Sequence, residues 1–187
     1  MALSKIDVAN MVTGAVPVAN GGTALTSGFA NGVTVADSWR LTSNVTDAVD
    51  PIASNLEQSD TDGAGQLGSA MTVSSGIFTF PSTGFWLIIF TGNTYLNGDS
   101  RHHHLSIHTT TDNSSYNLAA TGYMFIQQTS SNTTQSSATC HFLFDVTNVT
   151  THKCKFVFEN VQNSSTILEG STSADDTCFK FIRLGDT

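Results

Sequence analysis

The sequence predicts an all-β protein, a sandwich of short antiparallel strands that assembles into an oligomer. Residues 76–90 contain two apolar segments on either side of a Pro-Ser-Thr-Gly turn that ends at Gly84. Before the turn, Phe78 and Phe80 lie two residues apart, which is the period of a half-buried strand. After the turn, residues 85–90 are apolar on both strand faces. One face can enter the core of a sandwich, so the other must be covered by another sheet or another subunit.

The expected strands follow one another at the short spacing of a β-sandwich. The first is expected at residues 37–42, and the acidic, Gly- and Ser-rich residues 57–70 are expected to form a loop. Polar turns are expected at residues 96–99, 110–115 and 128–137. The other strands are expected at residues 71–80, 85–95, 102–109, 116–127, 140–146, 154–160 and 178–184.

Composition argues against several classes of function. Only 12% of the residues are charged and the formal net charge is −8, so no basic patch is available for nucleic acid or for an anionic membrane. No apolar run reaches the roughly 18 residues that a membrane span needs. The first residues lack the apolar segment of a secretory signal.

We expect no enzyme and no cofactor. The sequence contains no G-x-S-x-G, P-loop or H-E-x-x-H motif. Its only glutamates are Glu57, Glu159 and Glu169, so paired carboxylates for acid–base catalysis are scarce. No catalytic residue is therefore assigned.

A histidine-rich segment is the strongest candidate for a metal site. Alternation along a strand would place His102, His104 and His108 on one face, where neutral imidazoles could bind a metal around a three-fold axis. The alternative is a polar outer face, with His103, Leu105 and Ile107 turned inwards. We expect the alternative, and no resident metal.

The three cysteines, at positions 140, 154 and 178, are expected to be buried, reduced thiols. Their odd number fits a protein made in the cytosol. Because residues 140–146 and 154–160 are expected to form a hairpin, a disulfide between Cys140 and Cys154 is the alternative.

The motif G-x-F-x-x-P-x-x-G-x-W resembles the G-x-F-x-x-P-x-x-G-x-Y signature of C1q/TNF-like jelly rolls, with Trp in place of Tyr. Its residues are Gly76, Phe78, Pro81, Gly84 and Trp86. Residues 179–186 are similar to the last strand of that family, and residues 140–158 to its F–G strand pair. The resemblance covers about residues 37–187. It implies a jelly-roll β-sandwich, a homotrimer, and a function by binding rather than catalysis.

The resemblance has two further implications. Some C1q-like trimers hold calcium, which makes Asp60 and Asp62 candidate oxygen ligands, although we expect a solvated loop there. Together with the two-sided apolar strand, the trimeric family predicts a subunit interface. Its residues are expected to be Trp86, Ile88, Phe90, Phe179 and Phe181.

Residues 1–36 have a different composition, rich in Gly, Ala, Thr and Ser, and are expected to form an arm or linker before a jelly-roll domain at residues 37–187. The stretch VPVANGGTAL, residues 16–25, resembles PVANGGTG-type segments near the N-termini of tailed-phage structural and tail-fibre-like proteins. The expected anchoring residues of the arm are Lys5, Ile6, Val8, Met11 and Val12.

These observations predict a structural protein of a bacteriophage virion, made in the host cytoplasm. We expect a trimeric capsid decoration or fibre protein whose arm binds phage capsid or tail proteins. One alternative is a tail-fibre or spike tip that binds a receptor on the host surface. A second alternative is a free, soluble C1q-like recognition protein.

Overall fold

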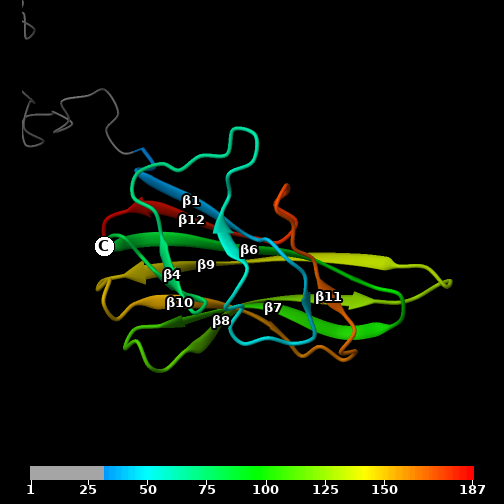
Figure 1. The fold of residues 1–187 in the computed structure, drawn as a ribbon. Coiled ribbons are helices and arrows are strands. Elements are labelled where there is room, and N and C mark those ends of the chain that lie inside the picture. Colours follow the sequence, from blue (N-terminus) through cyan, green and yellow to red (C-terminus); the bar gives the residue numbers. More distant parts are fainter. Residues whose placement is uncertain (1–31) are drawn as a thin grey trace, which may run out of the picture. The chain divides into compact units, whose positions relative to one another are not determined.

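The computed structural model describes residues 32–187, which form two antiparallel sheets stacked face to face (Figure 1). Sheet A has the strand order β2-β11-β6-β12-β1-β3, and β9 also pairs with β6. Sheet B has the order β4-β5-β10-β7-β8. The described residues contain no helix, which confirms the predicted all-β sandwich.

The strands of sheet A are β1 (Val35–Leu41), β2 (Val45–Thr46), β3 (Leu56–Gln58), β6 (Gly84–Leu96), β9 (Thr134–Val146), β11 (Ile167–Leu168) and β12 (Cys178–Gly185). The strands of sheet B are β4 (Thr72–Ser74), β5 (Ile77–Thr79), β7 (Ser100–Thr110), β8 (Asn117–Ile126) and β10 (Lys153–Glu159). In residues 32–187, no helix is available to cross a membrane.

The compact unit that contains these strands is Val33–Thr187. It begins slightly before the expected domain boundary at residue 37, because Val35 already pairs with Arg183 of β12. The expected anchoring residues of the arm lie outside the described part of the chain.

The turn before β6 depends on glycine. Gly84 has a φ of 137°, and a Cβ at this position would lie 2.4 Å from the carbonyl oxygen of Gly185. The turn expected to end at Gly84 is therefore confirmed, and it brings the start of β6 against the end of β12.

Two sequence expectations about β9 are wrong. Residues 134–137 were expected in a polar turn, but β9 runs through them and pairs with β6 along its whole length, from Gly84↔Val146 to Leu96↔Thr134. Hydroxyl side chains support the pairing, since the Oγ1 atoms of Thr91 and Thr139 lie 2.9 Å apart. The expected hairpin does not form either, because β9 belongs to sheet A and β10 to sheet B.

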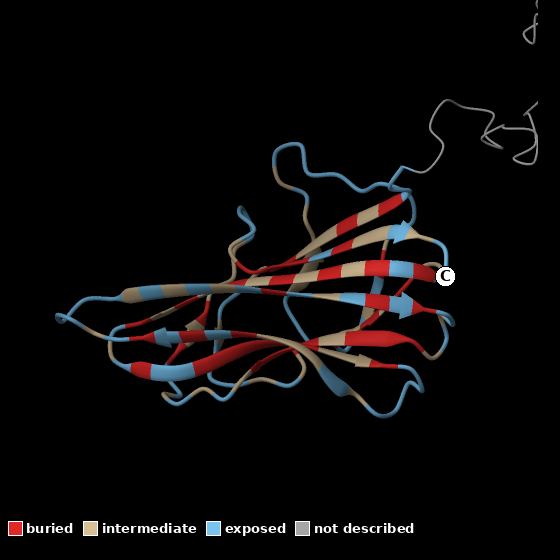
Figure 2. Ribbon diagram, turned by 180° about the vertical axis from the view of Figure 1, so that it is seen from behind, coloured by how far each residue is buried: buried red, intermediate tan, exposed pale blue. Residues whose placement is uncertain are grey.

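Aromatic rings fill the space between the sheets. Phe78 of β5 meets Trp39 and Phe156 edge to face, with ring centroids 5.5 and 5.4 Å apart. From the opposite sheet, Phe179 stacks on Phe90 at 5.0 Å. Figure 2 shows the resulting alternation of buried and less buried positions along the strands.

The predicted interface residues lie in this core. All five, Trp86, Ile88, Phe90, Phe179 and Phe181, are 0% exposed in the single chain. They pack against sheet B of their own chain, so they cannot contact another subunit, and the expectation chose the wrong face of β6 and β12. The pattern could not distinguish the faces because both are apolar.

Replacing Trp86 with Ala should lower the free energy of unfolding by about 3–5 kcal/mol, because the ring is fully buried against Phe80, 5.2 Å away between centroids. Chemical denaturation monitored by circular dichroism measures this change. Leu67→Ala is the control, since this apolar side chain is 48% exposed. Equal losses in the two variants would contradict the burial of Trp86 in the core.

Candidate functional site

The face of sheet A that points away from sheet B is apolar at its centre. Leu87 of β6 pairs with Leu143 of β9 on one side and with Ile182 of β12 on the other, so an apolar row crosses three strands. Phe85 and Ile89 extend it along β6. We call these five residues the outer apolar face. Phe85 is 38% and Leu143 53% exposed, and the other three are half-buried.

Polar and charged residues border the outer apolar face. Ile89 pairs with Lys180 on one side and His141 on the other, while Phe85 pairs with Asp145. These three polar partners are exposed. An apolar centre with a polar border is the usual composition of a protein–protein interface.

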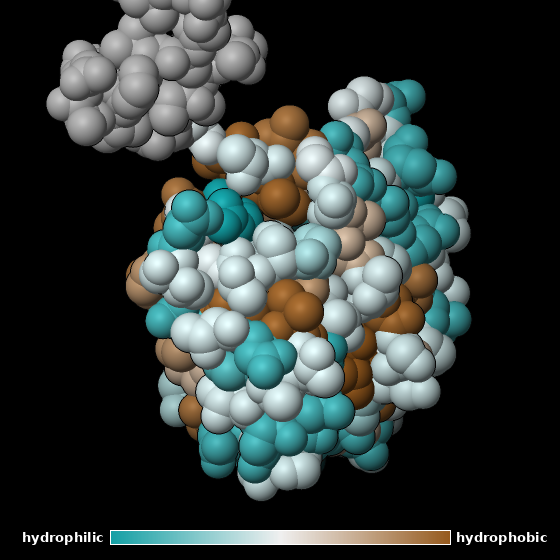
Figure 3. Space-filling view, turned by 90° about the vertical axis from the view of Figure 1, so that its left-hand side faces the viewer, coloured by the Kyte–Doolittle hydropathy of each residue, from teal (hydrophilic) through white to brown (hydrophobic). Residues whose placement is uncertain are grey.

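A second exposed apolar group lies on β8, the edge strand of sheet B. Leu118, Tyr123 and Phe125 are 58%, 71% and 65% exposed, respectively. We call these three residues the β8 patch. Figure 3 looks at the end of the sandwich where the C-terminus lies, and apolar residues appear there as separate patches among polar ones.

The histidines of β7 divide between the two faces of sheet B. His103, Leu105 and Ile107 are all 0% exposed and face the core, as expected. His102 and His104 point outwards and their Nε2 atoms lie 2.8 Å apart. His108 is separate from that pair and lies 3.8 Å from Glu159 Oε1. The three outward histidines therefore do not form one site, and no group of three metal-ligating side chains gathers within residues 32–187.

His103 is a buried polar residue held by two hydroxyl groups. Its Nε2 lies 2.9 Å from Thr94 Oγ1 and its Nδ1 3.3 Å from Ser100 Oγ. Burial, reinforced by the neighbouring His104, lowers the pKa of His103 to about 4. The side chain is therefore neutral near pH 7 and stabilises the core through its hydrogen bonds.

The candidate calcium ligands belong to a structural ion pair. The Asp60 carboxylate accepts a hydrogen bond from the guanidinium of Arg40, which also lies 2.6 Å from Glu57 Oε1. The Arg40 side chain is only 1% exposed, so the loop after β3 folds over it. Asp62 is exposed and does not share this contact.

The three cysteines are buried free thiols. Cys140 lies on β9 in sheet A and Cys154 on β10 in sheet B, so they do not face each other across a hairpin. Burial raises the pKa of Cys140 to about 11 and also raises the pKa of Cys154, which keeps both thiols protonated and unreactive.

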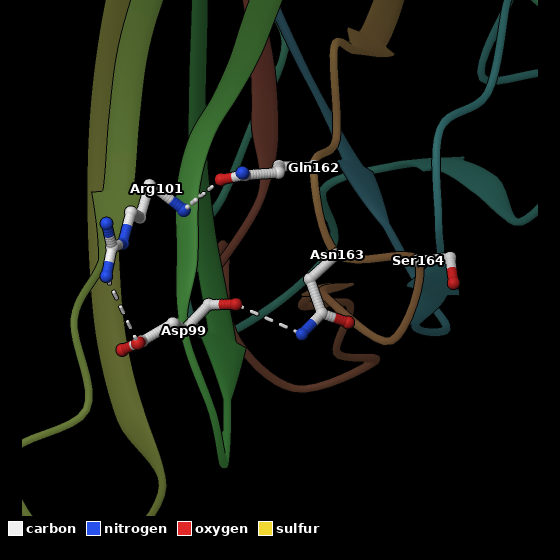
Figure 4. A pocket seen from close by; sticks show the side chains of 5 residues that line it. All are labelled: Asp99, Arg101, Gln162, Asn163 and Ser164. Atoms are coloured by element: carbon white, nitrogen blue, oxygen red, sulfur yellow. Dashed lines mark hydrogen bonds and ion pairs between the residues drawn. The ribbon is translucent and has the colours of Figure 1, made fainter.

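A polar recess of about 370 Å³ lies where the start of β7 meets the loop after β10 (Figure 4). Its lining side chains are largely engaged with one another. Gln162 Oε1 accepts from the backbone N–H of Arg101 at 3.0 Å, and Asn163 donates to the carbonyl oxygen of Asp99 at 3.0 Å. Among the lining residues Asp99, Arg101, Gln162, Asn163 and Ser164, no nucleophile has a base beside it.

Comparisons with known proteins identify the fold. No protein-family model and no curated protein matches the sequence. The structure is similar to Eiger TNF from S. frugiperda, with a TM-score of 0.60, 12% identity, and coverage of 83% of this chain and 96% of that one. It is also similar to murine APRIL at pH 5.0, with a TM-score of 0.56, 9% identity, and coverage of 80% and 98%. The chain therefore has a TNF-like jelly-roll fold.

The buried His103 should make the protein less stable in mild acid. Its pKa is lower in the folded than in the unfolded chain, so between about pH 6.5 and pH 4 the unfolded chain binds the extra proton. As the pH decreases through this range, the contribution of His103 should lower the free energy of unfolding by about 1 kcal/mol per pH unit. Denaturant titrations should show a flatter pH profile for His103→Gln. The exposed His141→Gln is the control and should retain the wild-type slope.

Proposed function

We propose that this protein is a non-enzymatic, homotrimeric structural protein of a bacteriophage virion. In this proposal the jelly roll assembles through its outer apolar face, and residues 1–36 attach the trimer to the particle. The observation that carries the assembly is the apolar row Leu143–Leu87–Ile182 on the outer side of sheet A, in which Leu143 is exposed and the other two residues are half-buried in the single chain.

The physical argument for assembly is that burial of apolar surface is favourable by roughly 25 cal/mol per Å². The outer apolar face lies on sheet A and the β8 patch on sheet B, so they point in different directions. Contact between two unlike surfaces of identical subunits forms a closed ring when the rotation between subunits fits. A ring of three agrees with the trimeric C1q/TNF-like family that the sequence resembles.

The polar recess at the start of β7 gives no support for catalysis, because its hydrogen-bonding groups are already engaged with one another. We therefore favour a function by binding. The TNF-like fold of the solved neighbours is consistent with this class of function. The virion role is supported by the phage-like segment at residues 16–25 and by the acidic net charge, which is unsuited to nucleic acid.

Attachment to a capsid as a decoration or fibre protein is the favoured role, since one jelly roll and a short arm suffice for it. A tail-fibre or spike tip that binds a host receptor would use the same trimer. A free recognition protein would leave the arm without a role. The copy number per particle separates the first two roles, because decoration requires many more copies than a fibre.

Leu87→Lys should convert the trimer into a folded monomer, because it places a charge at the centre of the outer apolar face. Light scattering measures the mass, and circular dichroism verifies the fold. Thr72→Lys, exposed on the opposite edge strand β4 of sheet B, is the control and should remain trimeric. A wild-type protein that is monomeric at low concentration would refute the assembly.

Deleting residues 1–16 should leave a folded trimer that no longer attaches to phage particles. The measurement is co-sedimentation with particles that lack the protein, beside the full-length chain. Ile6→Ser combined with Val8→Ser should weaken attachment in the same assay, whereas Thr13→Ser should not. Equal binding by the truncated and full-length proteins would place attachment on the jelly roll instead.

A further inference from the structure

His102 and His104 bring two imidazole nitrogens to one point on the outer side of sheet B. They are two residues apart on β7 and share a strand face. Their Nε2 atoms are 2.8 Å apart, their ring centroids 4.2 Å apart, and their planes are inclined by 78°. The contact is within hydrogen-bond distance, and the short separation of the centroids shows that the two rings are tilted toward each other rather than in line.

The inner member of the pair is fixed by its neighbours. His104 is 7% exposed and packs edge to face against Tyr123, with centroids 4.3 Å apart. Its Nδ1 lies 3.2 Å from the side-chain amide of Asn160. Asn160 follows β10 in the left-handed backbone region, with a φ of 53°, a conformation that Asn tolerates better than most residues.

Asn160 can serve either tautomer of His104. Its amide donates through Nδ2 to an unprotonated Nδ1, and after rotation it accepts through Oδ1 from a protonated one. The second arrangement leaves the Nε2 lone pair of His104 free to bind a cation, and is the usual support for a metal-bound histidine.

The outer member of the pair is accessible, because His102 is exposed. The two Nε2 atoms lie within hydrogen-bond distance, so one proton can lie between them, and a cation can take the place of that proton.

We propose that the Nε2 atoms of His102 and His104 form a two-nitrogen binding site for a divalent transition-metal ion. A cation about 2.0–2.1 Å from both nitrogens would see them about 85–90° apart. That angle matches neighbouring positions in square-planar or tetragonal coordination, the geometry of Cu²⁺ and Ni²⁺, better than tetrahedral coordination. Water supplies the remaining positions.

The site is independent of the proposed virion role and of His108, whose ring lies beside Glu159. It is also distinct from a three-fold site with one histidine per subunit, since both ligands come from one chain. Asn160 is a positioning residue, because it acts through His104 rather than on the ion.

The test is a titration of the full-length protein with Cu²⁺ at neutral pH, in a buffer that does not coordinate the ion, followed by calorimetry and electron paramagnetic resonance. We expect one ion per chain and nitrogen hyperfine coupling from two imidazoles. His102→Ala should weaken binding about tenfold or more, and Asn160→Gly, which keeps the positive φ, should weaken it by a similar factor. His108→Gln on the same strand face is the control and should bind like the wild type.

Wild-type protein without a Cu²⁺ site of this stoichiometry would overturn the proposal. So would a His102→Ala variant that binds as well as wild type, or a His108→Gln variant that loses binding. His104→Ala gives a second reading, since it should remove one coupled nitrogen from the resonance spectrum. Unchanged binding in Asn160→Gly would overturn the positioning role of Asn160.

Discussion

Strand β6 is hydrogen-bonded along both edges and apolar on both faces over residues 85–90. Its inner face carries Trp86, Ile88 and Phe90, which pack against sheet B and are fully buried. Its outer face has no sheet of the same compact unit to cover it. The fold therefore buries half of the apolar surface of this strand, and the proposed assembly covers the other half. A sandwich of two layers cannot bury both faces of one strand within a single chain, because each sheet has only one inner face.

The two outer surfaces of the sandwich differ in chemistry. Sheet A presents an apolar row across β9, β6 and β12, which suits contact with another protein. Sheet B presents His102, His104 and Glu159 beside the more apolar β8 patch. Subunit contact is proposed between the outer apolar face and the β8 patch, and the proposed metal site borders that patch, because Tyr123 packs against His104.

The inner side of β7 shows how a polar residue is accommodated in an aromatic core. His103 lies edge to face with Phe158, with centroids 6.0 Å apart, and both ring nitrogens have hydroxyl partners. Neighbouring histidines on one strand therefore have opposite roles: His103 stabilises the core as a neutral residue, while His104 faces outwards. Strand alternation separates them, since successive side chains point to opposite sides of a sheet.

The sequence by itself determined the all-β class, the order of the longer strands and the turn at Gly84, because these follow from short-range periodicity and from backbone conformations that few residues adopt. It also indicated that β6 has two apolar faces and that His103 turns inwards. Only the tertiary structure decided which face of β6 is buried, that β9 and β10 lie in different sheets, and that Asp60 pairs with Arg40. It alone brought His102 and His104 together with Asn160. These outcomes depend on pairing between strands distant in sequence, and a local pattern carries no information about such partners.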